Sequence, residues 1–127
     1  MIKSLNYVFG KVEVYDYYMI VTMNAGIHIS PEHNNILEDL VLTYYYDKPF
    51  VYLTHRKNSY SVDPVIYFET DKIENMVGFG VIAEVPVSGG NAEIEKLFLN
   101  KPFKIFLNRD EAVHWAKQRI EDELKRS

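Results

Sequence analysis

The stretch from Phe50 to Tyr67 constrains the fold of this chain more than any other part of the sequence. It opens with an apolar run of β-branched and aromatic residues, Phe50–Thr54, which is typical of a buried strand. A polar segment follows. Asp63-Pro64 then combines a helix-capping side chain with a proline suited to the first helical position. The stretch therefore predicts a buried strand, a polar loop and a new helix in succession.

The segments on either side of this stretch predict alternating helices and strands. Strand-forming residues come first along the chain, and helix start and stop signals then separate further apolar segments. This order indicates an α/β fold: an N-terminal strand meander with an antiparallel edge, then parallel strands joined by helices, four helices in all. The expected strands are Leu5–Phe9, Val12–Tyr15, Tyr18–Asn24, Phe50–Thr54, Met76–Val85 and Phe103–Leu107, and the expected helices begin at Ser30-Pro31, Asp63-Pro64, Ala92 and the capping box Asn108–Glu111.

Single residues within these elements carry further expectations. Gly78 and Gly80 interrupt a predicted strand, which favours close approach of another backbone or of a helix. The apolar stripe of the last helix predicts that Ile120 and Leu124 face inward. Ile36, Leu37, Leu40, Val41 and Tyr44 recur at helical spacing and predict the buried stripe of the first helix. Tyr45 and Tyr46 fall beside this stripe and should face outward or into a groove.

Length and composition narrow the class of protein. The 127 residues suit a single domain, residues 1–127, and the apolar fraction of 47% is enough for a hydrophobic core that needs no disulfide or metal cross-link. The chain has no cysteine and a net charge of −4, so we expect no thiolate site and no nucleic-acid partner. It shows neither a signal peptide nor an apolar run long enough for a membrane span, and a cytoplasmic location is expected.

Candidate site residues gather where the predicted parallel strands end. In open α/β sheets ligands bind at the carboxyl ends of the strands. The binding or regulatory candidates there are Arg56, Lys57, Ser59, Ser61, Asp63, His28 and His55. The cations and helix amides suit an anion, and the histidines suit proton transfer, but ordinary loop hydrogen bonds and self-capping of the helix by Asp63 explain the same residues. We expect no catalytic group, no metal and no cofactor, since no motif for them is present.

Three phrases of the sequence resemble a known family. Asn58–Pro64, Ile94–Phe98 and Lys101–Phe103 are similar to small bacterial STAS/SEC14-like proteins, and the order of elements resembles the STAS (SpoIIAA-like) fold of anti-sigma-factor antagonists. The resemblance implies a regulatory module that binds a protein partner. In the antagonists a serine at the start of the second helix is phosphorylated. Ser59 and Ser61 lie in the corresponding segment, although the Asp-Ser pair of that family is absent.

Three classes of function follow from these observations. A non-enzymatic interaction or regulatory module is the leading hypothesis, and a binder of a small apolar, lipid-like ligand is the alternative. An enzyme with an unidentified substrate is the third. An apolar cavity near the strand ends would favour the ligand binder, whereas a flat surface with exposed aromatic residues would favour the interaction module. Two side chains converging in a cleft would favour the enzyme. The sequence leaves the oligomeric state open.

Overall fold

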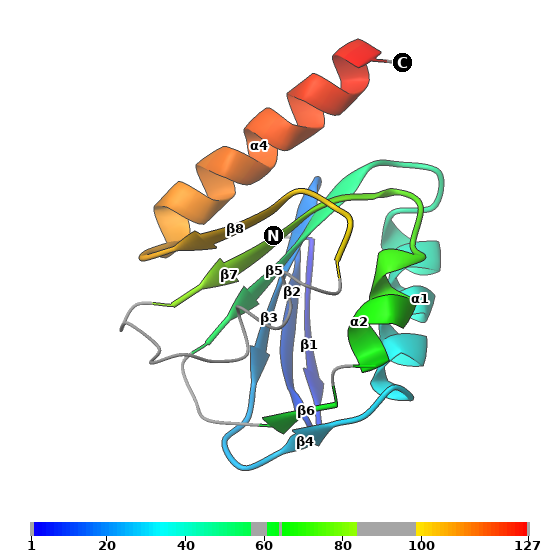
Figure 1. Ribbon diagram of the computed structural model, residues 1–127, viewed down its shortest axis with the longest axis vertical. Helices are drawn as coiled ribbons and strands as arrows, with labels where there is room; N and C mark the ends of the chain where they lie inside the picture. Colours follow the sequence, from blue (N-terminus) through cyan, green and yellow to red (C-terminus); the bar gives the residue numbers. More distant parts are fainter. Residues whose placement is uncertain (1, 57–60, 64, 84–98, 127) are drawn as a thin grey trace.

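The computed structural model describes residues 2–56, 61–63, 65–83 and 99–126, and over these residues it forms an α/β fold with a six-stranded mixed sheet (Figure 1). The order across the sheet is β1-β2-β3-β5-β7-β8, and β4 and β6 form a separate small sheet. The strands are β1 (Lys3–Tyr7), β2 (Gly10–Val14), β3 (Tyr18–Met23), β4 (His28–Ile29), β5 (Phe50–His55), β6 (Ser61–Val62), β7 (Met76–Ile82) and β8 (Phe103–Phe106).

The sheet confirms the predicted division into an antiparallel edge and a parallel part. β1, β2 and β3 pair antiparallel as a meander, and β3, β5, β7 and β8 pair in parallel in the order of the chain. Because the parallel strands follow one another in a single direction, their order does not reverse. The described sheet therefore contains no switch point of the kind that creates a ligand crevice in doubly wound folds.

Helices cover both faces of the sheet. α1 (His33–Tyr44) and α2 (Val65–Asp71) lie on one face, and α4 (Arg109–Arg126) lies on the other (Figure 1). Every residue of β5 is buried, with Tyr52 packing in the α1/α2 core and Val51 and Leu53 in the α4 core. This confirms the prediction of a buried strand, and the structure shows that both of its faces are covered, since alternate side chains of a strand point to opposite faces.

Some expected elements differ from the structure. The helix expected to start at Ala92 falls on residues 84–98, outside the described residues, so α1, α2 and α4 are the described helices. α1 starts at His33 rather than beside Ser30, whose hydroxyl bonds Glu32 and His33 instead of capping the helix. Ser61 was expected in a loop, but its backbone pairs with His28 in the β4–β6 sheet.

Among the buried residues, Tyr45 departs most clearly from its predicted environment. It is 0% exposed and stacks on Phe50 with ring centroids 4.8 Å apart. Its hydroxyl lies 2.7 Å from the Tyr15 carbonyl oxygen and 2.6 Å from that of Tyr18, and donates to them. Burial raises the pKa of Tyr45. The residue after α1 thus ties the helix end to the turn before β3, which the helical spacing could not show.

The glycines of β7 accommodate α4, as the sequence predicts. A Cβ atom at Gly78 would lie 3.0 Å from the Trp115 ring, and one at Gly80 would lie 2.6 Å from Leu53. Trp115 contacts the ring of Phe106, with centroids 5.4 Å apart. The missing side chains therefore let the indole sit against the strand, and the α4 face of the sheet is closely filled.

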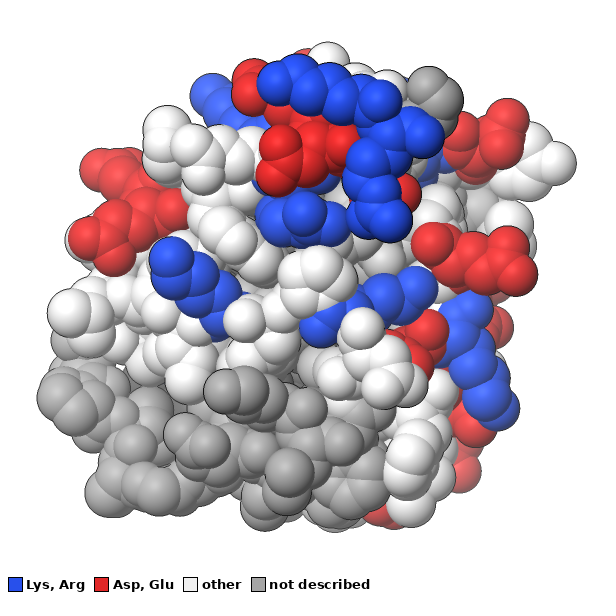
Figure 2. All heavy atoms as spheres, turned by 45° about the horizontal axis from the view of Figure 1, so that its top comes forward, with Lys and Arg blue, Asp and Glu red and all other residues white. Residues whose placement is uncertain are grey.

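Polar contacts hold α4 to the sheet at its first residue and again past its middle. Arg109, its first residue, donates to Glu13 on β2 at 2.7 Å, and Tyr15 donates to the other Glu13 oxygen at 2.9 Å. Burial acts to raise the pKa of Glu13, but the hydrogen bonds from Arg109 and Tyr15 outweigh it and hold that pKa below its ordinary value. Further along α4, Arg119 donates to the Val77 carbonyl oxygen. Figure 2 shows basic and acidic side chains interspersed at the top of the view.

We predict that the two apolar residues at the end of α4 differ sharply in their effect on stability. Ile120 is 3% exposed and packs in the α4 core, whereas Leu124, expected inward, is 56% exposed. Ile120→Ala should lower the free energy of unfolding by about 2–5 kcal/mol, because it removes buried methyl groups and leaves a cavity. Leu124→Ala, the matched control, should lower it by less than about 0.5 kcal/mol. Urea unfolding followed by circular dichroism measures both, and equal losses would show that α4 is placed wrongly.

Candidate functional site

The candidate site is an apolar cavity of about 70 Å³ between the sheet and the helices α1 and α2. Val21, Tyr52 and Phe79 from three adjacent parallel strands form its floor. Leu37 and Leu40 of α1 and Ile66 of α2 form the opposite wall. The cavity is about half the size of an apolar cavity of roughly 150 Å³ that binds benzene in another protein. Its position between layers is unlike the crevice expected beyond the strand ends.

The polar side chains of the cavity gather toward the carboxyl ends of the strands. Along β5 and its continuation, Tyr52, Thr54 and Arg56 are successive side chains on the cavity face, and all three line the cavity. Tyr52 and Thr54 are buried, whereas Arg56 is partly exposed. The strand register places Val21 beside Thr54. The cavity is thus apolar in its interior and becomes cationic where its lining approaches solvent.

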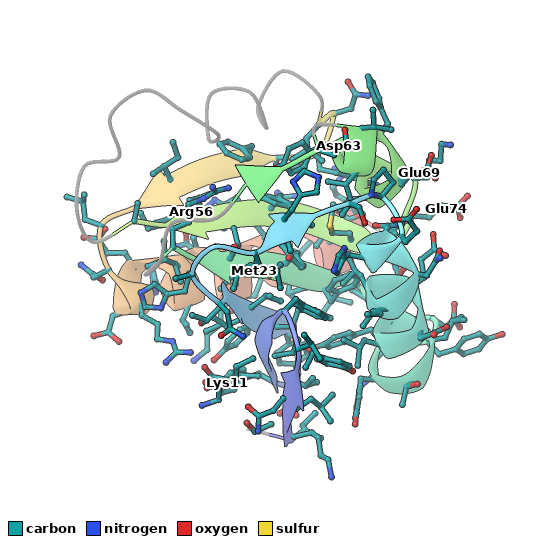
Figure 3. The ribbon with its side chains drawn as sticks, turned by 90° about the horizontal axis from the view of Figure 1, so that it is seen from below. Lys11, Met23, Arg56, Asp63, Glu69 and Glu74 are labelled. Atoms are coloured by element: carbon teal, nitrogen blue, oxygen red, sulfur yellow. The ribbon has the colours of Figure 1, made fainter. Side chains whose placement is uncertain are left out.

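Arg56 is fixed by the strand that precedes it. Its backbone N–H donates to the Ile82 carbonyl oxygen at 2.9 Å, which continues the pairing of β5 with β7. The Nε atom of its side chain is shielded from solvent. Figure 3 views the sheet from below and shows Arg56 and Met23 at this end of the sheet, beside β4 and β6, with Lys11 farther out. Arg56 is the one lysine or arginine among the described residues that line the cavity.

His33 joins this polar end from the first turn of α1. Its Nδ1 atom lies 3.1 Å from the backbone nitrogen of Ser30 and 3.2 Å from the Ser30 carbonyl oxygen. Its ring also meets Phe9 edge to face, with centroids 5.4 Å apart. The backbone N–H groups of His33 and Asn34 donate to the carbonyl oxygens of Ser30 and Pro31. These amide groups therefore donate their hydrogen bonds within the turn. The polar groups at this end of the cavity are side chains.

A buried hydrogen-bond chain joins the two helices at the cavity wall. Thr70 of α2 donates to the Oδ1 atom of Asn34 at 2.9 Å and to the Ile66 carbonyl oxygen at 3.0 Å. The Asn34 amide donates in turn to Glu38 at 3.0 Å. Asn34 and Thr70 are both buried and line the cavity. This chain holds α2, a helix of 7 residues, against α1 and so fixes the shape of the wall.

The structure separates the residues that the sequence grouped as candidates. Among the candidates whose side chains the structure describes, Arg56 lines the cavity, and His28, His55 and Asp63 do not. Asp63 accepts a hydrogen bond from the Val65 backbone N–H at 3.1 Å, as expected for self-capping of the helix, and its own N–H donates to Ile29. Lys57 and Ser59 lie outside the described residues, and Ser61 is described through its backbone alone.

The two candidate histidines do not share an environment. His28 is exposed on β4. His55, the last residue of β5, is buried, and the alternation of the strand places it on the α4 side of the sheet, away from the cavity. Over the described residues, no group of three histidine, aspartate or glutamate side chains is arranged to hold a metal ion.

Sequence reasoning missed most of the cavity. The helical spacing did place Leu37 and Leu40 on the inward stripe of their helix, where Leu40 is buried and Leu37 is partly buried. However, an apolar side chain that lines a cavity and one that fills a core have the same pattern in the sequence. The signal that could have found the site is Arg56 itself, because it continues the inward alternation of Tyr52 and Thr54 beyond a buried strand.

Comparison with known proteins identified no relative of this chain. No family model matches this sequence, and neither a curated protein nor a solved structure matches it. The resemblance to STAS-fold proteins and the cytoplasmic location therefore stay predictions. In the described part of the chain, none of the helices has the length and apolar character that crossing a membrane requires.

The bond between Thr70 and Asn34 gives a prediction about the cavity wall. Thr70→Val keeps the shape of the side chain but leaves the buried Asn34 oxygen without its donor, so it should cost about 1–3 kcal/mol of unfolding free energy. Thr43→Val is the matched control, because the Thr43 hydroxyl bonds the Asp39 carbonyl oxygen on the exposed face of α1. That change should cost less than about 0.5 kcal/mol.

Thermal unfolding of the two valine variants and the wild type measures this difference. The double variant Asn34→Leu, Thr70→Val should recover part of the loss, since replacing both partners removes the unsatisfied group. A Thr70→Val variant as stable as the wild type would contradict the arrangement of the two helices.

Proposed function

We propose that this protein binds a small apolar ligand in the cavity between the sheet and α1/α2. The single observation that carries the proposal is the cavity itself, which is lined mainly by apolar side chains between the layers and whose polar end reaches the carboxyl end of β5. Ligand sites in proteins are concave and mostly apolar, with a few polar groups that fix orientation. An apolar cavity near the strand ends was the feature expected to favour a ligand binder over an interaction module.

The contrast between the two faces of the sheet supports the same proposal. On the α4 face, Trp115 fills the space left by Gly78 and Gly80. On the α1/α2 face, the side chains of the floor and of the helices leave a cavity of about 70 Å³. Empty apolar space costs stability, because its lining loses contacts that a filled core would make. Ligand binding would therefore explain why the α1/α2 face keeps a cavity while the α4 face is closely packed.

A second candidate is the interaction module that the sequence favoured. Val65 and Phe68 stand three residues apart on α2 and are 50% and 51% exposed, so they form an apolar pair on one side of the helix. The pair lies directly after the segment in which the STAS resemblance places a regulatory serine. Exposed aromatic side chains can anchor a protein partner. The two functions are compatible, since a ligand beneath α2 could change the affinity of its outer face for a partner.

The ligand proposal predicts a definite dependence of affinity on chain length. Linear primary alcohols from butanol to decanol should bind about fourfold more tightly for each added CH₂ group that enters the cavity. The affinity should then level off once the cavity is full. Isothermal titration calorimetry on the purified protein, after extraction of any bound apolar molecule, measures the series.

Matched variants on the two faces locate the site. Val21→Leu extends a cavity-lining side chain, so it should move the plateau to an alcohol shorter by about one carbon. Val51→Leu makes the same change on the α4 face, where the side chain is fully buried, and it should leave the alcohol series unchanged. Absence of binding for every alcohol would overturn the ligand proposal and favour the interaction module. An equal shift for both variants would place the site elsewhere.

A further inference from the structure

We infer that the ligand is an amphipathic carboxylate whose chain fills the cavity and whose carboxylate is bound by Arg56. This inference rests on the proposed function and specifies the class of ligand. The cavity has one cationic end: along β5, Tyr52 and Thr54 lie in its buried part, and Arg56 is the partly exposed lining residue beyond them. A ligand matched to this gradient has an apolar tail and one anionic head.

The charges around the cavity favour an anion over a cation. Among the described residues that line the cavity, Arg56 carries a positive charge, and neither aspartate nor glutamate is present. The Arg56 guanidinium contributes a positive charge at a partly shielded position, where an ion pair is stronger than in bulk water. The acidic residues labelled in Figure 3, Asp63, Glu69 and Glu74, lie on the side of α2 and not beside Arg56.

The geometry of an arginine side chain favours a carboxylate among anions. The guanidinium is a planar fork that donates two parallel hydrogen bonds to the two oxygens of one carboxylate. A phosphate monoester carries more charge and more acceptor oxygens than one arginine satisfies. The first amides of α1 do not add donors, because His33 and Asn34 donate to Ser30 and Pro31. One arginine and a short apolar cavity therefore match a monocarboxylate of modest chain length.

Thr54 and His33 can orient the head group beside Arg56. Thr54 is the cavity-facing residue that precedes Arg56 on β5, and its hydroxyl can donate to a carboxylate oxygen. His33 lines the same cavity from the start of α1, and the backbone of Ser30 fixes its ring. These two residues are positioned to select orientation, whereas Arg56 supplies the charge that distinguishes an acid from an alcohol.

Ligands of one chain length and different head groups test this inference. Calorimetry near neutral pH should show that octanoate binds the wild-type protein about tenfold or more tightly than 1-octanol, and that octylammonium binds more weakly than the alcohol. Octyl phosphate should bind no more tightly than octanoate. This order uses the wild-type protein alone, so it does not depend on whether any variant folds.

Variants of Arg56 then assign the preference to one side chain. Arg56→Met should abolish the preference for octanoate over 1-octanol, because it removes the positive charge at this end of the cavity. Arg56→Lys should keep part of the preference, because it retains the charge without the bidentate fork. Lys11→Met, the control for loss of one positive charge, changes an exposed residue of β2 away from the cavity and should keep the full preference.

The outcomes separate this inference from the proposed function. Equal binding of octanoate and 1-octanol by the wild type would overturn the carboxylate assignment while the apolar site stands. A preference that survives in Arg56→Met would overturn the role of Arg56. Tighter binding of octyl phosphate than of octanoate would replace the carboxylate by a phosphate. Failure of all four ligands to bind would overturn the proposed function and this inference together.

Discussion

The parallel pairing of β5 with β3 on one side and β7 on the other is the interaction on which the rest of the structure depends. Six consecutive residues of β5 are buried, and its backbone is bonded along both edges. A strand in this position presents alternate side chains to two separate cores. Tyr52 and Thr54 therefore belong to the α1/α2 side, and Val51 and Leu53 belong to the α4 side.

The two cores that β5 separates are filled in different ways. On the α4 side, glycines in β7 bring Trp115 onto the strand, and Arg109 and Arg119 add polar contacts at either end of the interface. On the other side, aromatic and aliphatic side chains of the sheet, α1 and α2 surround a cavity. The position of Arg56 follows from the same alternation, because the side chain two residues beyond Thr54 returns to the cavity face.

Local signals in the sequence predicted many of the helices and strands, whereas the cavity is formed by tertiary contacts between residues far apart in the chain. Asp63 caps the start of α2, and Asn108 accepts a hydrogen bond from the Glu111 backbone, so these two predicted caps are confirmed, whereas the cap predicted at Ser30 is not formed. Capping depends on residues within one turn and can therefore be read locally. Tyr45 and Leu124 were assigned to the wrong environment because helical spacing gives the direction of a side chain but not the extent of its partner surface. The small β4–β6 sheet joins segments of two residues each, too short to show a period.

The candidate site shows the same division. Arg56 was among the residues predicted to matter, since it follows a central strand and lines the cavity, whereas His55, predicted alongside it, lies on the α4 side of the sheet. The neighbours of Arg56 in space come from β3, β7, α1 and α2, whose packing brings together residues far apart in the chain. The gap left between those layers depends on the distances at which the helices pack, which no local pattern encodes.

The most direct test of the central claim uses the methionines on the cavity face of the sheet. Met19 and Met23 line the cavity, whereas Met76 is buried in the same core but outside the cavity lining. In protein labelled with carbon-13 at the methionine methyl groups, titration with octanoate should shift the Met19 and Met23 signals with one common dissociation constant and leave Met76 unchanged. Met→Leu variants assign the signals. Signals of Met19 and Met23 that stay fixed while octanoate binds would show that the cavity is not the site.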